Sequence, residues 1–227
     1  MRTTFQDSFS FSSMESAQDK YIREHSEAQG EALAWIERQT NIRTNYPRML
    51  TGGVEGRLLT MIAGMCGAKD ILEIGTFTGY SAVCLAEGAA PGGHVDTLEL
   101  NDELEDIIRE GWERAGVTEM VTLHLGDALD TLKVFASEGR RYDLVYIDAN
   151  KREYLDYYLL CREMLRPGGV ILADDVMLGG KVYAGKDSVD KQTAGLMAFN
   201  DYVAADESVE VVMLPVRDGL SIIRKKL

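Results

Sequence analysis

Short apolar segments alternate with helical patterns from Lys69 to the C-terminus, and this alternation constrains the fold more than any other feature. Seven segments have the length and apolar content of β-strands: Asp70–Gly75, Val95–Glu99, Val121–Leu125, Tyr142–Asp148, Val170–Asp174, Val209–Pro215 and Leu220–Arg224. Helical patterns lie between them: Tyr80–Gly88, Asp102–Ala115, Ala128–Ser137, Glu153–Leu165 and Asp190–Ala205. This alternation predicts a doubly wound α/β fold, with a mostly parallel seven-stranded sheet and helices on both faces.

The two ends of the chain depart from the alternation. Arg217-Asp218-Gly219 separates the last two predicted strands and is a turn signal, which predicts a closing antiparallel hairpin. The first part of the chain shows only helical patterns: one long helix over Ser13–Thr40, broken or bent near Gly30, and a second over Gly53–Met65. We therefore expect an N-terminal helical extension, residues 1–50, before a single domain of residues 51–227.

The composition excludes several classes of protein. With 45% hydrophobic and 27% charged residues and no long apolar run, the chain is expected to be globular and cytoplasmic, without a membrane span or secretory signal. A net charge of -13 disfavours nucleic acid as a partner, because most of the surface would repel phosphate. The three cysteines have no metal-binding spacing, which predicts buried reduced thiols at Cys66, Cys84 and Cys161.

Acidic residues gather at the ends of the first five predicted strands, where the ligands of parallel sheets bind. They are Glu73, Glu99, Asp127, Asp148, Asp174 and Asp175. One such acid is often only a cap of the following helix. Acids on all five strands at one edge indicate a ligand site.

The turn Gly75-Thr76-Phe77-Thr78-Gly79 joins the first strand to a helix but does not fit a dinucleotide. Phe77 stands where the G-x-G-x-x-G pattern needs its second glycine, and Glu73 places negative charge beside the site. A cofactor with a positive centre and no phosphate, such as adenosylmethionine, fits this edge better. Glu99 is then placed to accept hydrogen bonds from the ribose hydroxyls, and Asp127 to accept one from the adenine amino group.

Four strings of residues lie at these strand ends, in order and at characteristic spacings. They are Glu73-Ile74-Gly75-Thr76-Phe77-Thr78-Gly79-Tyr80-Ser81, Gly126-Asp127-Ala128, Tyr146-Ile147-Asp148-Ala149-Asn150-Lys151 with Tyr154, and Leu165-Arg166-Pro167-Gly168-Gly169 leading to Asp174. Together they resemble the cation-dependent O-methyltransferases typified by catechol and caffeoyl-coenzyme A O-methyltransferases, over about Arg48 to Lys226. The resemblance implies a Rossmann-like methyltransferase fold, adenosylmethionine as cofactor, a small vicinal diol as acceptor and a homodimer.

The resemblance also implies roles for individual residues. Asp148, Asp174 and Asp175 would bind a divalent cation, and hard oxygen ligands suit magnesium, with calcium or manganese as alternatives. Lys151 falls where catechol methyltransferases carry the lysine that takes the acceptor proton, a role that needs a lowered pKa. Lys151 and Asp148 are thus the expected catalytic residues. The residues implied to bind the cofactor are Glu73, Gly75, Phe77, Ser81, Glu99, Asp127 and Asp148.

Two positions depart from the family pattern. Position 175 is usually asparagine, so Asp175 adds a negative charge and predicts tighter cation binding or a different cation. The segment Met49–Gly53 differs from the serine-proline pattern common there, which leaves Thr51 only weakly assigned to the segment that closes over the pocket.

Alternative functions stay open at this point. Bacterial relatives that look like this chain methylate a hydroxyuridine of transfer RNA, and a basic cluster of Arg48, Arg57, Lys181 and Lys186 would favour that function. A non-catalytic adenosylmethionine-binding protein would use the same fold, although the intact Asp148, Lys151 and Asp174 set argues against it. A hydride-transfer enzyme is the third alternative.

Overall fold

A computed structural model describes residues 16–184 and 189–227, and its centre is a seven-stranded sheet. The strands are β1 (Asp70–Ile74), β2 (His94–Glu99), β3 (Val121–Leu125), β4 (Tyr142–Ile147), β5 (Leu165–Ala173), β6 (Val209–Leu214) and β7 (Leu220–Lys225). Their order is β3-β2-β1-β4-β5-β7-β6. Strands β1 to β5 are parallel, and β7 pairs antiparallel with both β5 and β6. The predicted doubly wound sheet with its closing hairpin is confirmed.

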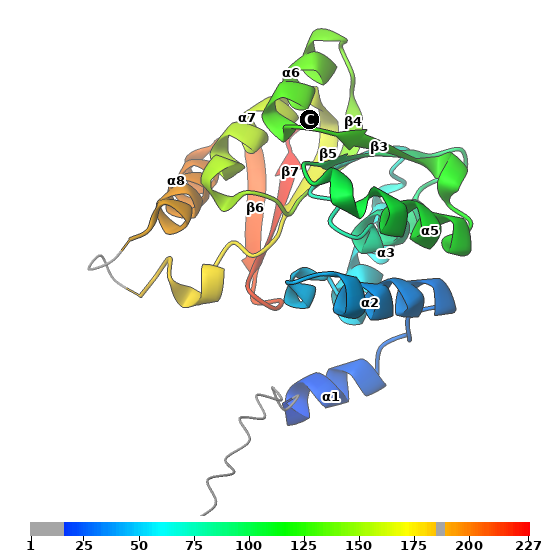
Figure 1. The fold of residues 1–227 in the computed structure, drawn as a ribbon. Helices are drawn as coiled ribbons and strands as arrows, with labels where there is room; N and C mark the ends of the chain where they lie inside the picture. Colours follow the sequence, from blue (N-terminus) through cyan, green and yellow to red (C-terminus); the bar gives the residue numbers. More distant parts are fainter. Residues whose placement is uncertain (1–15, 185–188) are drawn as a thin grey trace, which may run out of the picture.

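Helices cover both faces of this sheet (Figure 1). The main helices are α1 (Ala17–Glu24), α2 (Glu31–Arg43), α3 (Gly53–Cys66), α4 (Tyr80–Gly88), α5 (Glu105–Ala115), α6 (Ala128–Ser137), α7 (Tyr154–Met164) and α8 (Lys191–Ala205). Single turns of 3-10 helix lie at η1 (Pro47–Met49), η2 (Asp102–Leu104), η3 (Thr118–Met120), η4 (Lys151–Glu153) and η5 (Leu178–Gly180). Helices α2 to α5 pack on one face, and α6 to α8 pack on the other.

Successive side chains along a strand point to opposite faces of the sheet and pack into two separate hydrophobic cores. Ile71 of β1 packs with the α2–α5 side, whereas the next residue, Leu72, packs with the α6–α8 side. Both side chains are fully buried, and each contributes about 1.5–3 kcal/mol of hydrophobic stabilisation. Because strands buried on both faces need apolar residues throughout, these segments read as continuous apolar runs in the sequence.

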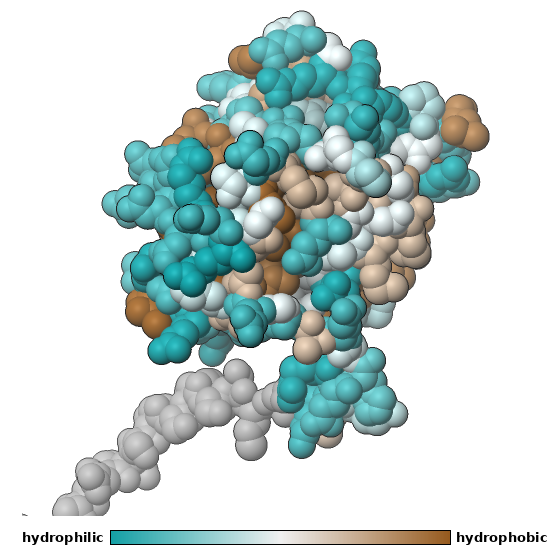
Figure 2. Space-filling view, turned by 90° about the vertical axis from the view of Figure 1, so that its right-hand side faces the viewer, coloured by the Kyte–Doolittle hydropathy of each residue, from teal (hydrophilic) through white to brown (hydrophobic). Residues whose placement is uncertain are grey.

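The N-terminal extension is divided into two helices, as the predicted break near Gly30 requires. Helix α1 buries no side chain, whereas α2 buries Leu33, Ile36 and Thr40 against the body. Figure 2 shows α1 as a mainly hydrophilic unit at one end of the molecule. The predicted start of the first helix, at Ser13, lies outside the described residues.

Two details of the sequence prediction are wrong. Cys84 and Cys161 are buried, but Cys66 is exposed because it ends α3 on the solvent side of that helix. Strand β5 begins at Leu165 rather than Val170, since Leu165 pairs with Tyr142 ahead of an irregularity in the β4–β5 register. Within the described residues, no helix combines the length and apolar character that crossing a membrane requires.

Helix α8 packs directly on the turn that carries Lys151. A Cβ on Gly195 would lie 2.7 Å from the Lys151 carbonyl oxygen and 2.8 Å from Arg152 Cα. Both are backbone atoms, so no side-chain movement relieves the overlap. Gly195 therefore fixes the approach of α8 to η4.

We predict that Gly195→Ala destabilises the protein by about 1–3 kcal/mol, the cost of overpacking, although alanine is normally the better helix residue. Gly64→Ala in α3 is the matched control, because its Cβ would meet nothing closer than the Gly88 oxygen at 3.7 Å. That variant should be stabilised by about 0.5–1 kcal/mol. Urea denaturation of both variants checks this prediction, and equal effects at the two positions would contradict it.

Candidate functional site

The turn after β1 approaches the loop after β4 so closely that only glycine fits. Gly75 has φ of 102°, and a Cβ there would lie 2.0 Å from the Asp148 carbonyl oxygen. The Asp148 amide, just after β4, donates a 2.9 Å hydrogen bond to the carbonyl of Ile74, the last residue of β1. This close packing places the ends of β1 and β4 side by side.

Glu99, at the end of β2, holds its carboxylate against the same turn. Its Oε2 accepts a 2.7 Å hydrogen bond from the Phe77 amide, and its Oε1 accepts one of 2.8 Å from the Asn101 amide. Burial raises the pKa of Glu99, although these backbone donors oppose the rise. The carboxylate is therefore fixed in position at the edge of the sheet.

Glu73 lies beneath the cavity and is not among the residues that line it. Its side chain is fully buried, its Oε2 accepts a 2.5 Å hydrogen bond from Thr97 Oγ1, and its Oε1 has no partner. Burial raises the pKa of Glu73 to about 8, although the neighbouring Ser81 and Thr97 hydroxyls act to lower it. Because Thr97 Oγ1 also lies 2.6 Å from Thr76 Oγ1, Glu73 is linked through Thr97 to the turn after β1.

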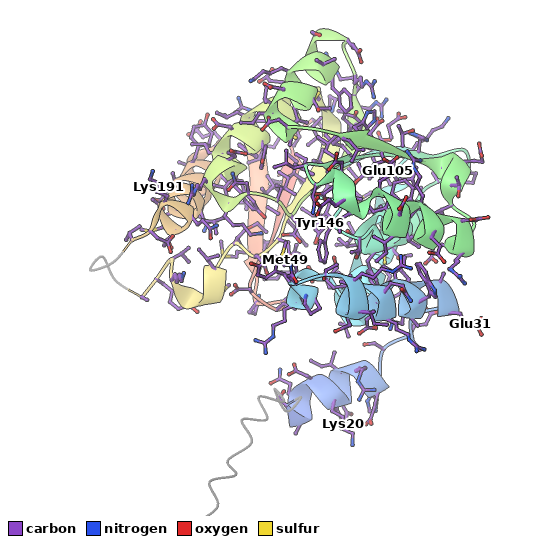
Figure 3. All side chains as sticks on the ribbon, in the orientation of Figure 1. Lys20, Glu31, Met49, Glu105, Tyr146 and Lys191 are labelled. Carbon is purple, nitrogen blue, oxygen red and sulfur yellow. The ribbon has the colours of Figure 1, made fainter. Side chains whose placement is uncertain are left out.

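Two adjoining cavities occupy the carboxyl edge, and they share Met49, Gly75, Phe77 and Asp148 in their walls. The first is lined in addition by Thr51, Ser81, Lys151, Asp175, Leu178 and Gln192. The second is lined in addition by Glu99, Gly126, Asp127, Glu153 and Tyr157. Met49, labelled in Figure 3, lies on η1 beside this edge. Except for Glu73 and the buried Asp174, the residues predicted from the sequence all line this pair of cavities.

Asp127 has a second structural task besides lining the cavity. It is the N-cap residue of α6, and its Oδ1 accepts a 3.1 Å hydrogen bond from the Asp130 amide. Its side chain is otherwise exposed, so its second oxygen is free to face a ligand.

Asp148, Asp174 and Asp175 each offer a carboxylate oxygen, and these oxygens lie within 4.8 Å of one another. Asp174 is 2% exposed, and its Oδ1 has no hydrogen-bond partner. Burial, followed by the charges of the neighbouring carboxylates, raises the pKa of Asp174 to about 9. A buried oxygen without a partner and three converging carboxylates fit a hard divalent cation.

Lys151 is the positive group that contacts Asp148 and Asp175. Its Nζ lies 2.8 Å from Asp148 Oδ1 and 3.6 Å from Asp175 Oδ2. Burial acts to lower the pKa of Lys151, but the Tyr154 oxygen and the two carboxylates outweigh it and raise the pKa. A lysine needs a lowered pKa to act as a base on its own. The expected lowering is therefore not found for Lys151 while the charges of Asp148 and Asp175 are not offset.

Tyr154 and Glu55 belong to this cluster but were not predicted as site residues. Tyr154 Oη accepts a 2.5 Å hydrogen bond from Lys151 Nζ and donates one of 2.9 Å to the Asp174 carbonyl. The sequence feature that could have identified Tyr154 is its position one helical turn after Lys151. Glu55 is 1% exposed on α3, and an acid within a helical pattern gives no sign that it is buried.

A family model described as O-methyltransferase matches residues 23–226. The chain belongs to this O-methyltransferase family. It is thus an adenosylmethionine-dependent O-methyltransferase of the catechol and caffeoyl-coenzyme A type, as its sequence strings predicted.

Individual relatives of this O-methyltransferase agree with the family assignment. It is 39% identical over 148 residues to a catechol O-methyltransferase of Mycobacterium tuberculosis, a match that covers 65% of this chain and 66% of that one. It is 34% identical over 161 residues to a catechol O-methyltransferase of Niastella koreensis, covering 70% and 72%. The crystal structure of an O-methyltransferase from Bacillus cereus in complex with SAH superposes with a TM-score of 0.87 at 31% identity, covering 93% and 98%.

We predict that the ligand-free enzyme loses stability as the pH rises from about 5 to 8. The folded protein holds a proton on Glu73 up to a pKa of about 8, whereas the unfolded chain releases it near 4.5, so the stabilisation is full below 4.5 and lost on passing 8. In Glu73→Gln, the free energy of unfolding should fall less steeply with pH, by up to about 1.4 kcal/mol per pH unit. Asp174 leaves a residual slope of the same sign.

Urea denaturation at a series of pH values measures this slope. Glu119→Gln, at an exposed position, is the matched control and should retain the wild-type profile. A Glu73→Gln profile as steep as that of the wild type would show that Glu73 already ionises near its ordinary pKa in the folded protein.

Proposed function

We propose that this O-methyltransferase transfers a methyl group from adenosylmethionine to one hydroxyl of a small vicinal diol such as a catechol, with a divalent cation at the acidic cluster. One observation carries the proposal above the others. Three carboxylates and one buried lysine cluster around Asp148, which lines both cavities, so donor and acceptor sites would adjoin there.

The second cavity suits the adenosine part of the cofactor. Glu99 offers a fixed carboxylate for the ribose hydroxyls, and Asp127 offers an oxygen toward the adenine side. Gly75, Phe77 and Ser81 line the adjoining wall, which leads to the first cavity. The sulfonium would then lie near Asp148, whose negative charge suits a positive centre.

Asp148, Asp174 and Asp175 are the residues that would hold the cation. A bound divalent cation would favour ionisation of an acceptor hydroxyl and orient two neighbouring oxygens of a diol. Two features of Asp174 support this assignment: one of its oxygens has no partner, and burial followed by the charges of neighbouring carboxylates raises the pKa of its carboxyl. A cation would supply the missing partner and offset those charges. Holding donor and acceptor in attack geometry would contribute at most about 7–11 kcal/mol.

We assign receipt of the acceptor proton to Lys151. Its Nζ lies at the wall shared by the carboxylates and the first cavity. The carboxylates that raise its pKa are the groups whose charge a cation would offset, so Lys151 is expected to act as a base only in the loaded site. Tyr154 Oη and the Asp174 carbonyl hold the amine in place during this transfer.

A transfer RNA acceptor is less well supported. Arg57 Nε lies 3.4 Å from Glu27, and Lys181 Nζ lies 3.2 Å from Asp190, so each is already paired with an acid. Lys186 lies outside the described residues. The cavity walls carry five acids and the single lysine Lys151, which disfavours a polyanionic acceptor.

A methyl-transfer assay with labelled adenosylmethionine and a panel of catechols tests the proposal. We expect turnover with Mg²⁺ and a loss of about a hundredfold or more with chelator or with Asp148→Ala. Lys151→Met should lower kcat by about 10²–10⁴-fold. Lys133→Met, a surface lysine paired with Asp130, is the matched control and should keep full activity.

The outcomes of this assay separate the alternatives. Cofactor binding without methylation of any catechol would favour the transfer RNA or non-catalytic function. Activity that survives the chelator would refute the cation assignment.

We further predict that Asp175→Asn weakens Mg²⁺ binding by about tenfold, because it removes one full negative charge from the three-carboxylate cluster. Calorimetric titration of Mg²⁺ into both proteins measures this difference. Asp201→Asn, an exposed acid on α8, controls for net charge and should leave the affinity unchanged. Equal affinities for Asp175→Asn and the wild type would mean that the charge at position 175 does not contribute to cation binding.

A further inference from the structure

Arg217 has a backbone conformation that residues with side chains seldom adopt. It lies in the loop between β6 and β7 with φ of 45°, in the left-handed region. Four non-glycine residues of the described chain have positive φ, and the other three, Phe77, Asp175 and Leu178, line the first cavity. Strain of this kind gathers at functional sites and persists only where surrounding contacts maintain it.

The contacts of the Arg217 guanidinium maintain this strained backbone conformation. Nη1 donates to the carbonyl oxygens of Leu50, at 3.1 Å, and of Thr51. It also lies 2.8 Å from Glu55 Oε2. Leu50 and Thr51 form part of the wall of the first cavity, and we call these two residues the cover segment.

Glu55 connects this contact to the acidic cluster. Its carboxyl is buried in contact with Asp174, and its charge is the main influence after burial on the Asp174 carboxyl. Glu55 Oε1 and Asp174 Oδ1 are both buried without a hydrogen-bond partner. Arg217 therefore touches the cover segment and the acid that contacts Asp174 with one rigid group.

The same turn also holds the chain that follows Asp174 and Asp175. The Met177 amide donates 2.8 Å to the Asp218 carbonyl, and the Val176 amide donates 3.0 Å to the Gly219 carbonyl. In Figure 1 the β6–β7 loop, η1 and the segment after β5 meet at the lower edge of the sheet. The turn thus contacts two separate segments that line one cavity, residues 50–51 and the chain around Asp175 and Leu178.

We propose that Arg217 is a positioning residue that sets the cover segment relative to the acidic cluster, so that the acceptor side of the cavity and the cation site are aligned together. The proposal rests on the proposed cation-assisted transfer. The alternative is that Arg217 only balances the buried charge of Glu55, in which case any cation at this point would serve.

Two substitutions separate these alternatives. Arg217→Gly suits the left-handed backbone, so it removes the guanidinium while relieving the backbone strain. Arg217→Lys keeps the charge near Glu55, but its shorter side chain would withdraw the donor from the three oxygens that Arg217 Nη1 contacts. Glu55→Gln combined with Arg217→Gly leaves no unpaired buried charge and guards against a failure to fold.

The experiment measures hydrogen–deuterium exchange, Mg²⁺ affinity and the kinetics of catechol methylation. For all three variants we expect faster exchange at residues 48–55, about tenfold weaker Mg²⁺ binding and about tenfold higher KM for catechol. Adenosylmethionine affinity should change by less than about twofold, since the adenosine cavity has no contact with Arg217 among the described residues.

Arg162→Lys is the matched control, because Arg162 forms a comparable pair with the little-exposed Asp206, at 2.6 Å, away from both cavities. It should lower thermal stability without changing exchange at residues 48–55, Mg²⁺ affinity or KM. If Arg217→Lys behaves in the same way, or Arg217→Gly keeps wild-type exchange and affinity, the proposal is overturned. Exchange and Mg²⁺ affinity need no turnover, so this result stands apart from any failure of the proposed methyl transfer.

Discussion

The site depends on a concentration of acidic side chains, two of them buried, that its own basic groups only partly offset. Asp148, Asp174, Asp175 and Glu55 meet at one edge, with Lys151 and Arg217 as the positive groups in contact with them. A buried carboxylate without a partner costs several kcal/mol, so such a cluster is maintained only where the fold imposes it. The parallel strands impose it here, because β4 and β5 deliver their terminal acids to the same edge.

Close backbone packing keeps these acids in place. Gly75 allows the turn after β1 to reach the Asp148 carbonyl, and Gly195 allows α8 to reach the Lys151 turn. The strained residues lie around the same cavity, which indicates that the loops are shaped by the site rather than by their own preferences. Rigid strands and strained loops together give a preorganised pocket.

Most of the fold and the chemistry of the strand ends could be predicted from the sequence, because both depend on local pattern. Strand–helix alternation gave the sheet, and acids such as Glu99 and Asp148 mark the ends of their strands. The roles of Glu55 and Arg217 could not be predicted, since their contact joins residues 162 positions apart and each looks like a surface charge in the sequence. The direction of the Lys151 pKa shift was likewise hidden, because it depends on how many carboxylates the fold brings around one amine.

The central claim is that a divalent cation completes the three-carboxylate cluster, and the most direct test is anomalous scattering from crystals grown with Mn²⁺ and S-adenosylhomocysteine. The claim predicts one strong peak bonded to oxygens of Asp148, Asp174 and Asp175, and its disappearance in Asp174→Ala crystals. A cofactor-bound structure with no anomalous peak at this cluster, or with Lys151 still bonded to Asp148 in place of a cation, would contradict it.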